Sequence, residues 1–158
     1  MKMIIAIFLS MLVFLMGCAG LDPNEANVPD GQDFQFATVV HTAPDITVEV
    51  GFYDNFNATG FYLYFDNDND AMADFMVSCS ASTFTVRKKS GTGSFNDVKF
   101  SGVPTVSGKL YHLEFPLTSL ELSVPSTTHY WFAKLAGGGA GEDRMPDGWR
   151  SSEEFVIN

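Results

Sequence analysis

The sequence has few cysteines and few basic residues, and each shortage excludes a class of protein. Cys18 and Cys79 are the only cysteines among 158 residues, which excludes the disulfide framework of small secreted domains. Only 9 lysines and arginines stand against 19 aspartates and glutamates, for a net charge of −10. A chain this acidic is a poor partner for nucleic acid and for anionic lipid surfaces. We therefore expect no nucleic-acid partner, and a fold that is stabilised by its apolar core.

The sequence also lacks the motifs of the common enzyme classes. It contains no G-x-S-x-G and no H-E-x-x-H motif, and the glycines at 137–141 are followed by Glu142, whose charge would repel a bound phosphate. It has no C-x-x-C-H motif for covalent haem, and His41, His112 and His129 each occur singly in an expected strand or loop. We therefore predict a protein that is not an enzyme and does not carry haem.

The longest apolar run lies at the N-terminus. Residues 4–14 follow one positive charge, Lys2, and the length of this run falls within the roughly 7–15 residues of a signal-peptide core. The run is too short for a stable membrane-spanning helix. Residues 15–18, LMGC, resemble a bacterial lipobox. The resemblance implies cleavage before Cys18, a diacylglyceryl group joined to its sulfur as a thioether, and usually a third acyl chain, such as palmitate, on the new amino terminus. An ordinary secretory signal with an incidental cysteine is the alternative.

Lipidation would determine where the protein works. Two or three acyl chains hold a protein on a membrane, since each buried methylene contributes about 0.8 kcal/mol. Ala19 follows Cys18 where many inner-membrane lipoproteins have Asp, so the resemblance favours the outer membrane over the inner. We expect residues 1–17 to be the signal peptide, residues 18–32 to be the lipidated cysteine and a flexible tether, and residues 33–158 to fold in the cell envelope.

From residue 33 onward, apolar and polar residues alternate with a period of two. Ile46, Val48, Val50 and Phe52 show the pattern most clearly, with more polar neighbours between them. The pattern repeats at 61–65. Further candidate strands lie at 34–40, 75–79, 84–88, 95–100, 109–115, 129–135 and 154–157, and Asn, Asp, Gly and Pro separate them. About nine short strands without helical alternation predict an all-β fold, an antiparallel β-sandwich of the jelly-roll or immunoglobulin-like kind. Cys79 falls in one of these strands, where we expect a buried thiol.

An acidic loop, residues 66–74, joins two of the expected strands. Its candidate ligands are the carboxylates at relative positions 1, 3, 5 and 9 and one backbone carbonyl: Asp66, Asp68, Asp70, Asp74 and Met72. Calcium takes about six to eight oxygen ligands, and the spacing resembles the calcium loops of dockerin-like and thrombospondin-type repeats. Ala71 stands where such loops have Gly, so we predict a weak site, with a Kd of about 10⁻⁴ to 10⁻³ M. A solvated hairpin loop, in which Asp and Asn serve turn geometry, is the alternative.

Three segments resemble DOMON-like and family 9 carbohydrate-binding modules. They are FYLYFDNDNDAMADFMV at 61–77, KLYHLEFPLTSL at 109–120 and EDRMPDGW at 142–149. The resemblance covers roughly residues 33–157 and implies a β-sandwich. Members of such families bind sugars or haem, so the fold by itself does not choose a ligand.

Sugar binding requires exposed aromatic faces together with polar side chains. The candidates are Trp149, Trp131, Tyr62, Tyr64, Asp143 and Arg144. Trp149 lies in an expected loop, and its alternative role is to cap the end of the sandwich. The other three aromatic residues lie in expected strands, and their alternative role is to pack within the domain. We predict a non-catalytic envelope module that binds carbohydrate. The alternative is a structural or assembly lipoprotein that contacts an envelope protein through its sheet or edge strands.

Overall fold

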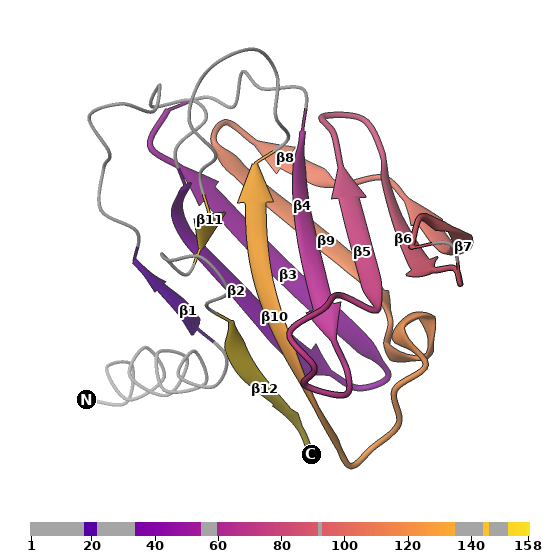
Figure 1. Ribbon diagram of the computed structural model, residues 1–158. Helices are drawn as coiled ribbons and strands as arrows, with labels where there is room; N and C mark the ends of the chain where they lie inside the picture. Colours follow the sequence, from indigo (N-terminus) through magenta and orange to yellow (C-terminus); the bar gives the residue numbers. More distant parts are fainter. Residues whose placement is uncertain (1–17, 22–33, 55–59, 92, 135–143, 146–151) are drawn as a thin grey trace, which may run out of the picture.

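The period-two segments of the sequence form β-strands. A computed structural model describes residues 18–21, 34–54, 60–91, 93–134, 144–145 and 152–158. Within these ranges the strands pair antiparallel in two sheets, which pack one behind the other (Figure 1). The predicted all-β antiparallel sandwich is therefore confirmed.

The first sheet contains five strands in the order β1-β2-β3-β9-β8. Their bounds are β1 (Cys18–Leu21), β2 (Phe34–Thr42), β3 (Asp45–Phe52), β9 (Leu110–Pro116) and β8 (Thr105–Ser107). The short turn between β2 and β3 closes the pair Thr42 and Asp45 and so fixes the register of this hairpin. β9 then pairs with β3 from the other side, with Val48 opposite Leu113.

The second sheet contains seven strands, in the order β11-β10-β4-β5-β6-β7, with β12 also paired to β10. Their bounds are β4 (Phe61–Asp66), β5 (Phe75–Cys79), β6 (Phe84–Lys89), β7 (Phe95–Gly102), β10 (Ser126–Lys134), β11 (Arg144–Met145) and β12 (Glu153–Ile157). The hairpin of β4 and β5 carries the acidic loop. β10 is distant from β4 in sequence and pairs along its other edge, with Trp131 opposite Tyr64.

The core between the sheets is largely aromatic. Phe34 and Phe52 of the first sheet stack with ring centroids 5.2 Å apart, and Phe61 of the second sheet meets Tyr111 of the first edge to face at 5.7 Å. All four of these side chains are buried. Because Phe61, Leu63 and Phe65 point inward along β4, the residues between them must point outward. The strand pattern thereby creates an outer face that carries tyrosines.

Several expectations about local structure are confirmed and a few elements are new. The nine expected strands all form, and residues 117–120, between β9 and β10, form a 3-10 helix, η1 (Leu117–Leu120). Cys79 is buried, and this burial raises the pKa of its thiol to about 12. The short strands β8 and β11 were not predicted.

The beginning of the expected tether is also a strand. Residues 18–21 form β1 and pair with β2, with Cys18 opposite Thr38, whereas we expected a flexible segment over residues 18–32. Residues 22–32 lie outside the described residues, as does the expected signal peptide. In the part of the chain that the structure describes, no helix has the length and apolar character needed to cross a membrane.

Candidate functional site

The outer face of the seven-stranded sheet gathers side chains from four strands. Alternation along each strand points every second residue away from the core, and the strand register aligns these residues in two rows. One row contains Tyr62, Ser78 and Thr85, and the other contains Trp131, Tyr64, Met76 and Arg87. All seven side chains are half-buried. The outer face is therefore a mixed aromatic and polar surface.

Four aromatic rings form a cluster on this face, which we call the aromatic cluster: Tyr62, Tyr64, Phe95 and Trp131. Tyr64 lies at its centre. The Trp131 indole stacks on the Tyr64 ring with centroids 5.3 Å apart and an angle of 21° between the planes. Tyr62 and Phe95 contact the same ring, at centroid distances of 5.7 and 6.0 Å. Tyr62 lies at the margin of the cluster, because its one ring contact among the described residues is with Tyr64.

A cleft adjoins the aromatic cluster at Tyr62. It has a volume of about 250 Å³, a little below the range of about 300–1,000 Å³ that is usual for small-molecule sites. We call it the outer cleft, and its lining residues are Tyr62, Ser78, Cys79, Ser80, Thr83, Thr85 and Arg87. Five of these residues carry hydroxyl groups, four of them serines and threonines, and hydroxyls both donate and accept hydrogen bonds. The outer cleft thus combines one aromatic ring, several neutral polar groups and one cation.

Hydrogen bonds hold the polar side chains of the outer cleft in place. The hydroxyls of Ser78 and Thr85 lie 2.8 Å apart, and Arg87 donates from Nε to Thr85 Oγ1 at 3.1 Å. At the end of β5, Ser80 donates to the Thr83 carbonyl at 3.0 Å, and Thr83 donates to the Gly102 carbonyl at 3.2 Å. These contacts preorganise the lining of the cleft before any ligand binds.

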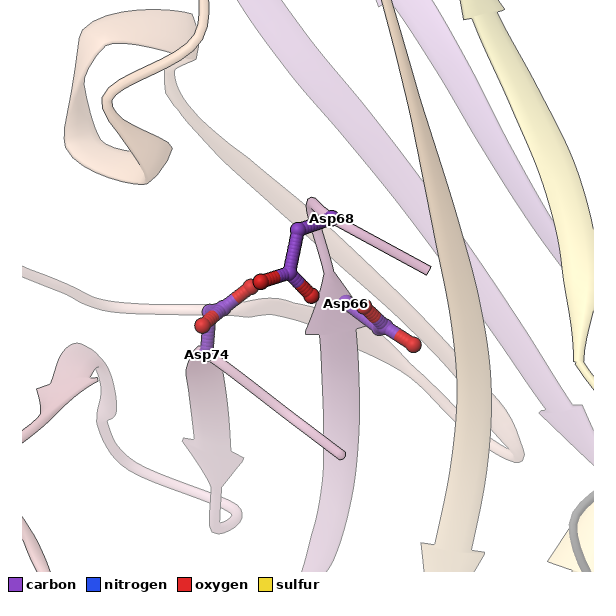
Figure 2. Close-up of side chains that lie close together, drawn as sticks. All are labelled: Asp66, Asp68 and Asp74. Carbon is purple, nitrogen blue, oxygen red and sulfur yellow. The ribbon is translucent and has the colours of Figure 1, made fainter. Parts of the chain in front are cut away.

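The acidic loop forms a second group of polar residues. Carboxylate oxygens of Asp66, Asp68 and Asp74 all lie within 4.8 Å of one another, so these three residues could hold a metal ion. Figure 2 shows the Asp68 carboxylate between those of Asp66 and Asp74. Asp70 is not part of this group, and its Oδ1 accepts a hydrogen bond from the Met72 backbone N–H at 2.8 Å. Three of the four predicted carboxylates therefore come together.

Asp66 also organises the backbone of the loop. The residue is 2% exposed, and its carboxylate accepts hydrogen bonds from the backbone N–H groups of Asn69 at 2.7 Å, Ala71 at 2.9 Å and Asp70 at 3.3 Å. Asn69 and Ala71 adopt left-handed conformations, with φ of 60° and 66°. Asp74 Oδ2 accepts the Asn67 N–H at 2.8 Å and draws the two ends of the loop together. The carboxylates thus serve turn geometry whether or not a cation is bound.

The loop is also attached to neighbouring elements. Asn67 donates from Nδ2 to the Leu120 carbonyl of η1 at 2.9 Å. The buried Thr128 hydroxyl on β10 lies 2.7 Å from Asn67 Oδ1 and 3.0 Å from the Asp66 carbonyl, and it can donate to either. These contacts hold the three grouped carboxylates in a rigid frame.

The structure brings some of the predicted sugar-binding residues together. Tyr62, Tyr64 and Trp131 share one outer face, and Trp131 does not enter the core. Trp149 and Asp143 lie outside the described residues, and only the backbone of Arg144 is described, in β11.

Sequence reasoning did not predict five contributors to the outer face: Met76, Ser78, Thr85, Arg87 and Phe95. The period-two pattern indicates that Thr85 and Arg87 share a face of β6, which was the available signal. Their proximity to Tyr62 depends on the pairing of β5 with both β4 and β6, which the pattern does not specify.

Comparison with known proteins identifies no relative. No family model matches the chain, and neither a curated protein nor a solved structure matches it significantly. The resemblances to lipoboxes, calcium loops and carbohydrate-binding modules therefore stay predictions.

Proposed function

We propose that this domain is a non-catalytic module that binds carbohydrate on the outer face of its seven-stranded sheet. The observation that carries the proposal is the position of Tyr62, which joins the aromatic cluster to a hydroxyl-lined cleft. A pyranose ring has apolar C–H faces that stack on aromatic rings, and hydroxyls that exchange hydrogen bonds with Ser and Thr. Both kinds of partner are present side by side at Tyr62.

The preorganisation of this surface supports the same function. Tyr64 is held between Trp131, Tyr62 and Phe95, so these rings lose little freedom when a ligand binds. The Ser78 and Thr85 hydroxyls are already oriented by each other and by Arg87. A weakly binding ligand such as a sugar benefits most from a surface of this kind, since little ordering entropy remains to be lost.

Glycan binding by variants of the full chain tests the proposal. Tyr62→Ala should weaken binding to any glycan that the protein recognises by at least fivefold, which corresponds to about 1 kcal/mol of stacking. The matched control is Tyr53→Ala, which removes a partly exposed tyrosine just after β3 in the other sheet. A glycan array and titration calorimetry supply the measurements. Equal losses in the two variants, or no binding by the wild type, would contradict the proposal.

A lipid anchor on Cys18 suits this location of the site. We propose that Cys18 is acylated and holds the domain at the envelope, in the outer membrane. β1 lies at the opposite side of the sandwich from β6 and β7 (Figure 1). A lipid on Cys18 would therefore leave the outer cleft on the side away from the anchor, where a glycan can reach it. Labelling with radioactive palmitate that is absent from Cys18→Ser would support the anchor, and an unlabelled wild type would contradict it.

The acidic loop is proposed as a weak structural calcium site. The grouped carboxylates of Asp66, Asp68 and Asp74 supply hard oxygen ligands of the kind that calcium prefers. The ion would join the ends of β4 and β5 and so stabilise the hairpin that carries Tyr62 and Tyr64.

Two edge strands support a second candidate function, docking of an envelope protein. Among the described residues, β7 pairs only with β6 and β8 only with β9, so each leaves one edge for a further strand. Val98, Val103 and Val106 lie along this side and are 50%, 76% and 41% exposed. Cross-linking from these positions to one specific envelope protein, with no response to sugars, would favour docking over carbohydrate binding.

A further inference from the structure

Arg87 is half-buried and differs from Lys88 and Lys99, the lysines of β6 and β7 that pair with carboxylates, while the exposed Lys109 donates to the Tyr53 carbonyl at 3.1 Å. Lys88 pairs with Glu121, and Lys99 pairs with Asp97 at 2.9 Å and with Glu121 at 3.0 Å. Hydrogen bonds from these two lysines lower the pKa of the Glu121 carboxyl group. Arg87 takes part in none of the salt bridges of the described residues, and its one hydrogen bond there runs from Nε to Thr85 Oγ1.

The acidity of the chain makes this contrast informative. With 19 acidic and 9 basic residues, a carboxylate partner is easily supplied to a cation that only needs stabilising. The cation of the outer cleft instead has a neutral hydroxyl as its partner. A guanidinium group carries five N–H donors in a planar fork that matches a carboxylate or sulfate group. Its Nη donors are uncommitted among the described residues, and Arg87 lines the outer cleft.

We propose that the outer cleft binds an acidic pyranose, whose ring stacks on Tyr62 and whose carboxylate pairs with Arg87. The inference rests on the proposed carbohydrate-binding function and names the class of sugar. A sulfate ester on a sugar carries the same charge as a carboxylate and has a similar arrangement of oxygens. The test therefore includes probes that carry each of these two groups.

The spacing of the two residues accommodates one sugar ring. Tyr62 and Arg87 stand two strands apart, on β4 and β6, and Arg87 lies two residues beyond Thr85, the residue in the row of Tyr62. Strand spacing and residue rise place their backbones about 12 Å apart. Both side chains line the same cleft, so a ring held against Tyr62 directs a substituent toward Arg87. The hydroxyls of Ser78 and Thr85 lie between them along the sheet.

The net charge of the protein does not prevent this recognition at physiological salt. A charge of −10 repels an acidic polysaccharide at long range, but the Debye length is about 8 Å at 0.15 M ionic strength. The contact between a guanidinium fork and a carboxylate acts within hydrogen-bond distance and is screened much less. Selectivity for acidic sugars should therefore be visible at 0.15 M salt.

The test uses matched pairs of oligosaccharides with the full chain in detergent micelles. The acidic probes are oligogalacturonate, oligomannuronate and oligoguluronate, each compared with its carboxyl-reduced neutral counterpart, and sulfated chondroitin fragments are compared with their desulfated forms. We expect at least one uronate to bind about tenfold or more tightly than its neutral counterpart. Arg87→Gln should abolish that preference, because binding of the uronate should weaken far more than binding of its neutral counterpart, whereas Arg87→Lys should keep only part of the preference, since the ammonium lacks the planar fork.

Two controls separate the inference from the proposed function. Lys109→Gln removes a positive charge from the turn between β8 and β9, away from the cleft, and should leave the preference intact. Tyr62→Ala should weaken the binding of acidic and neutral sugars to the same extent. Equal binding of acidic and neutral partners would overturn the inference and leave carbohydrate binding in place. Selectivity for sulfated fragments alone would overturn the carboxylate assignment, and no binding of any probe would overturn both proposals.

Discussion

Calcium binding by the acidic loop can be tested sharply because its three grouped carboxylates have different second roles. Asp66 accepts three backbone N–H groups and is needed for the loop conformation itself. Asp68 is exposed and accepts one long hydrogen bond, from the Asp70 N–H at 3.3 Å. The isosteric change Asp68→Asn therefore removes a ligand charge and leaves the scaffold of the loop in place.

The expected effect of calcium follows from linkage. With a Kd of about 10⁻⁴ to 10⁻³ M, about 10 mM calcium stabilises the folded state by about 1.4–2.7 kcal/mol. In a domain of this size, 1 kcal/mol shifts the melting temperature by about 3–5 °C. The wild type should therefore melt about 4–13 °C higher in calcium than in chelator.

Thermal melting of three variants completes the assay. Asp68→Asn should lose the calcium-dependent rise in melting temperature. In chelator, this variant should melt close to the melting temperature of the wild type. Asp70→Asn removes the same charge from outside the group and should keep most of the rise, since its Oδ1 can still accept the Met72 N–H. Asp66→Asn should lower the melting temperature in both conditions.

Two results would refute this reasoning. A wild type that melts at the same temperature in calcium and in chelator has no site in the loop. If Asp68→Asn and Asp70→Asn lose equal amounts of the calcium-dependent rise in melting temperature, the overall negative charge of the loop attracts the ion, rather than the geometry of the three grouped carboxylates.

Three further predictions concern stability and reactivity. Ala71→Gly should raise the free energy of unfolding, measured by urea denaturation, by about 0.5–1 kcal/mol. Ala71 has a φ of 66°, and the relief of about 1–2 kcal/mol of left-handed strain exceeds the entropic cost of glycine. A lower free energy of unfolding in this variant would contradict the prediction. Gly102→Ala should lower the free energy of unfolding by about 1–3 kcal/mol, because the added Cβ atom would lie 2.6 Å from the ring of buried Phe84. Gly91→Ala is the control and should leave the free energy of unfolding unchanged, because no atom lies within 4 Å of its added Cβ. The Cys79 thiol, with a pKa of about 12, should resist alkylation in the native protein at pH 8 and react on unfolding, as followed by peptide mass spectrometry. Because the unfolded thiol ionises near its ordinary pKa of 9.0 and the folded one does not, this group should reduce stability as the pH rises from about 9 toward 12.

The strands were predictable because alternation along a strand is a local property. Most of the nine expected segments have their own period-two pattern, and all nine form strands. β8 and β11 have only three and two residues, too few to show a period, and they are strands only through their pairing with β9 and β10. The same limit applies to β1, whose residues carry no strand pattern of their own.

The sequence by itself determined the residue types available for a site and, from their alternation, the face of its strand on which each one lies. It indicated the outward tyrosines of β4 and the spacing of the acidic loop, since both depend on residues close together in the chain. Only the tertiary structure decided which outward residues meet. β10 pairs with β4 and brings Trp131 onto Tyr64, and β6 pairs with β5 and brings Arg87 into the cleft beside Tyr62. Strand order and register arise from packing of the whole core, and no single segment of the sequence contains that information.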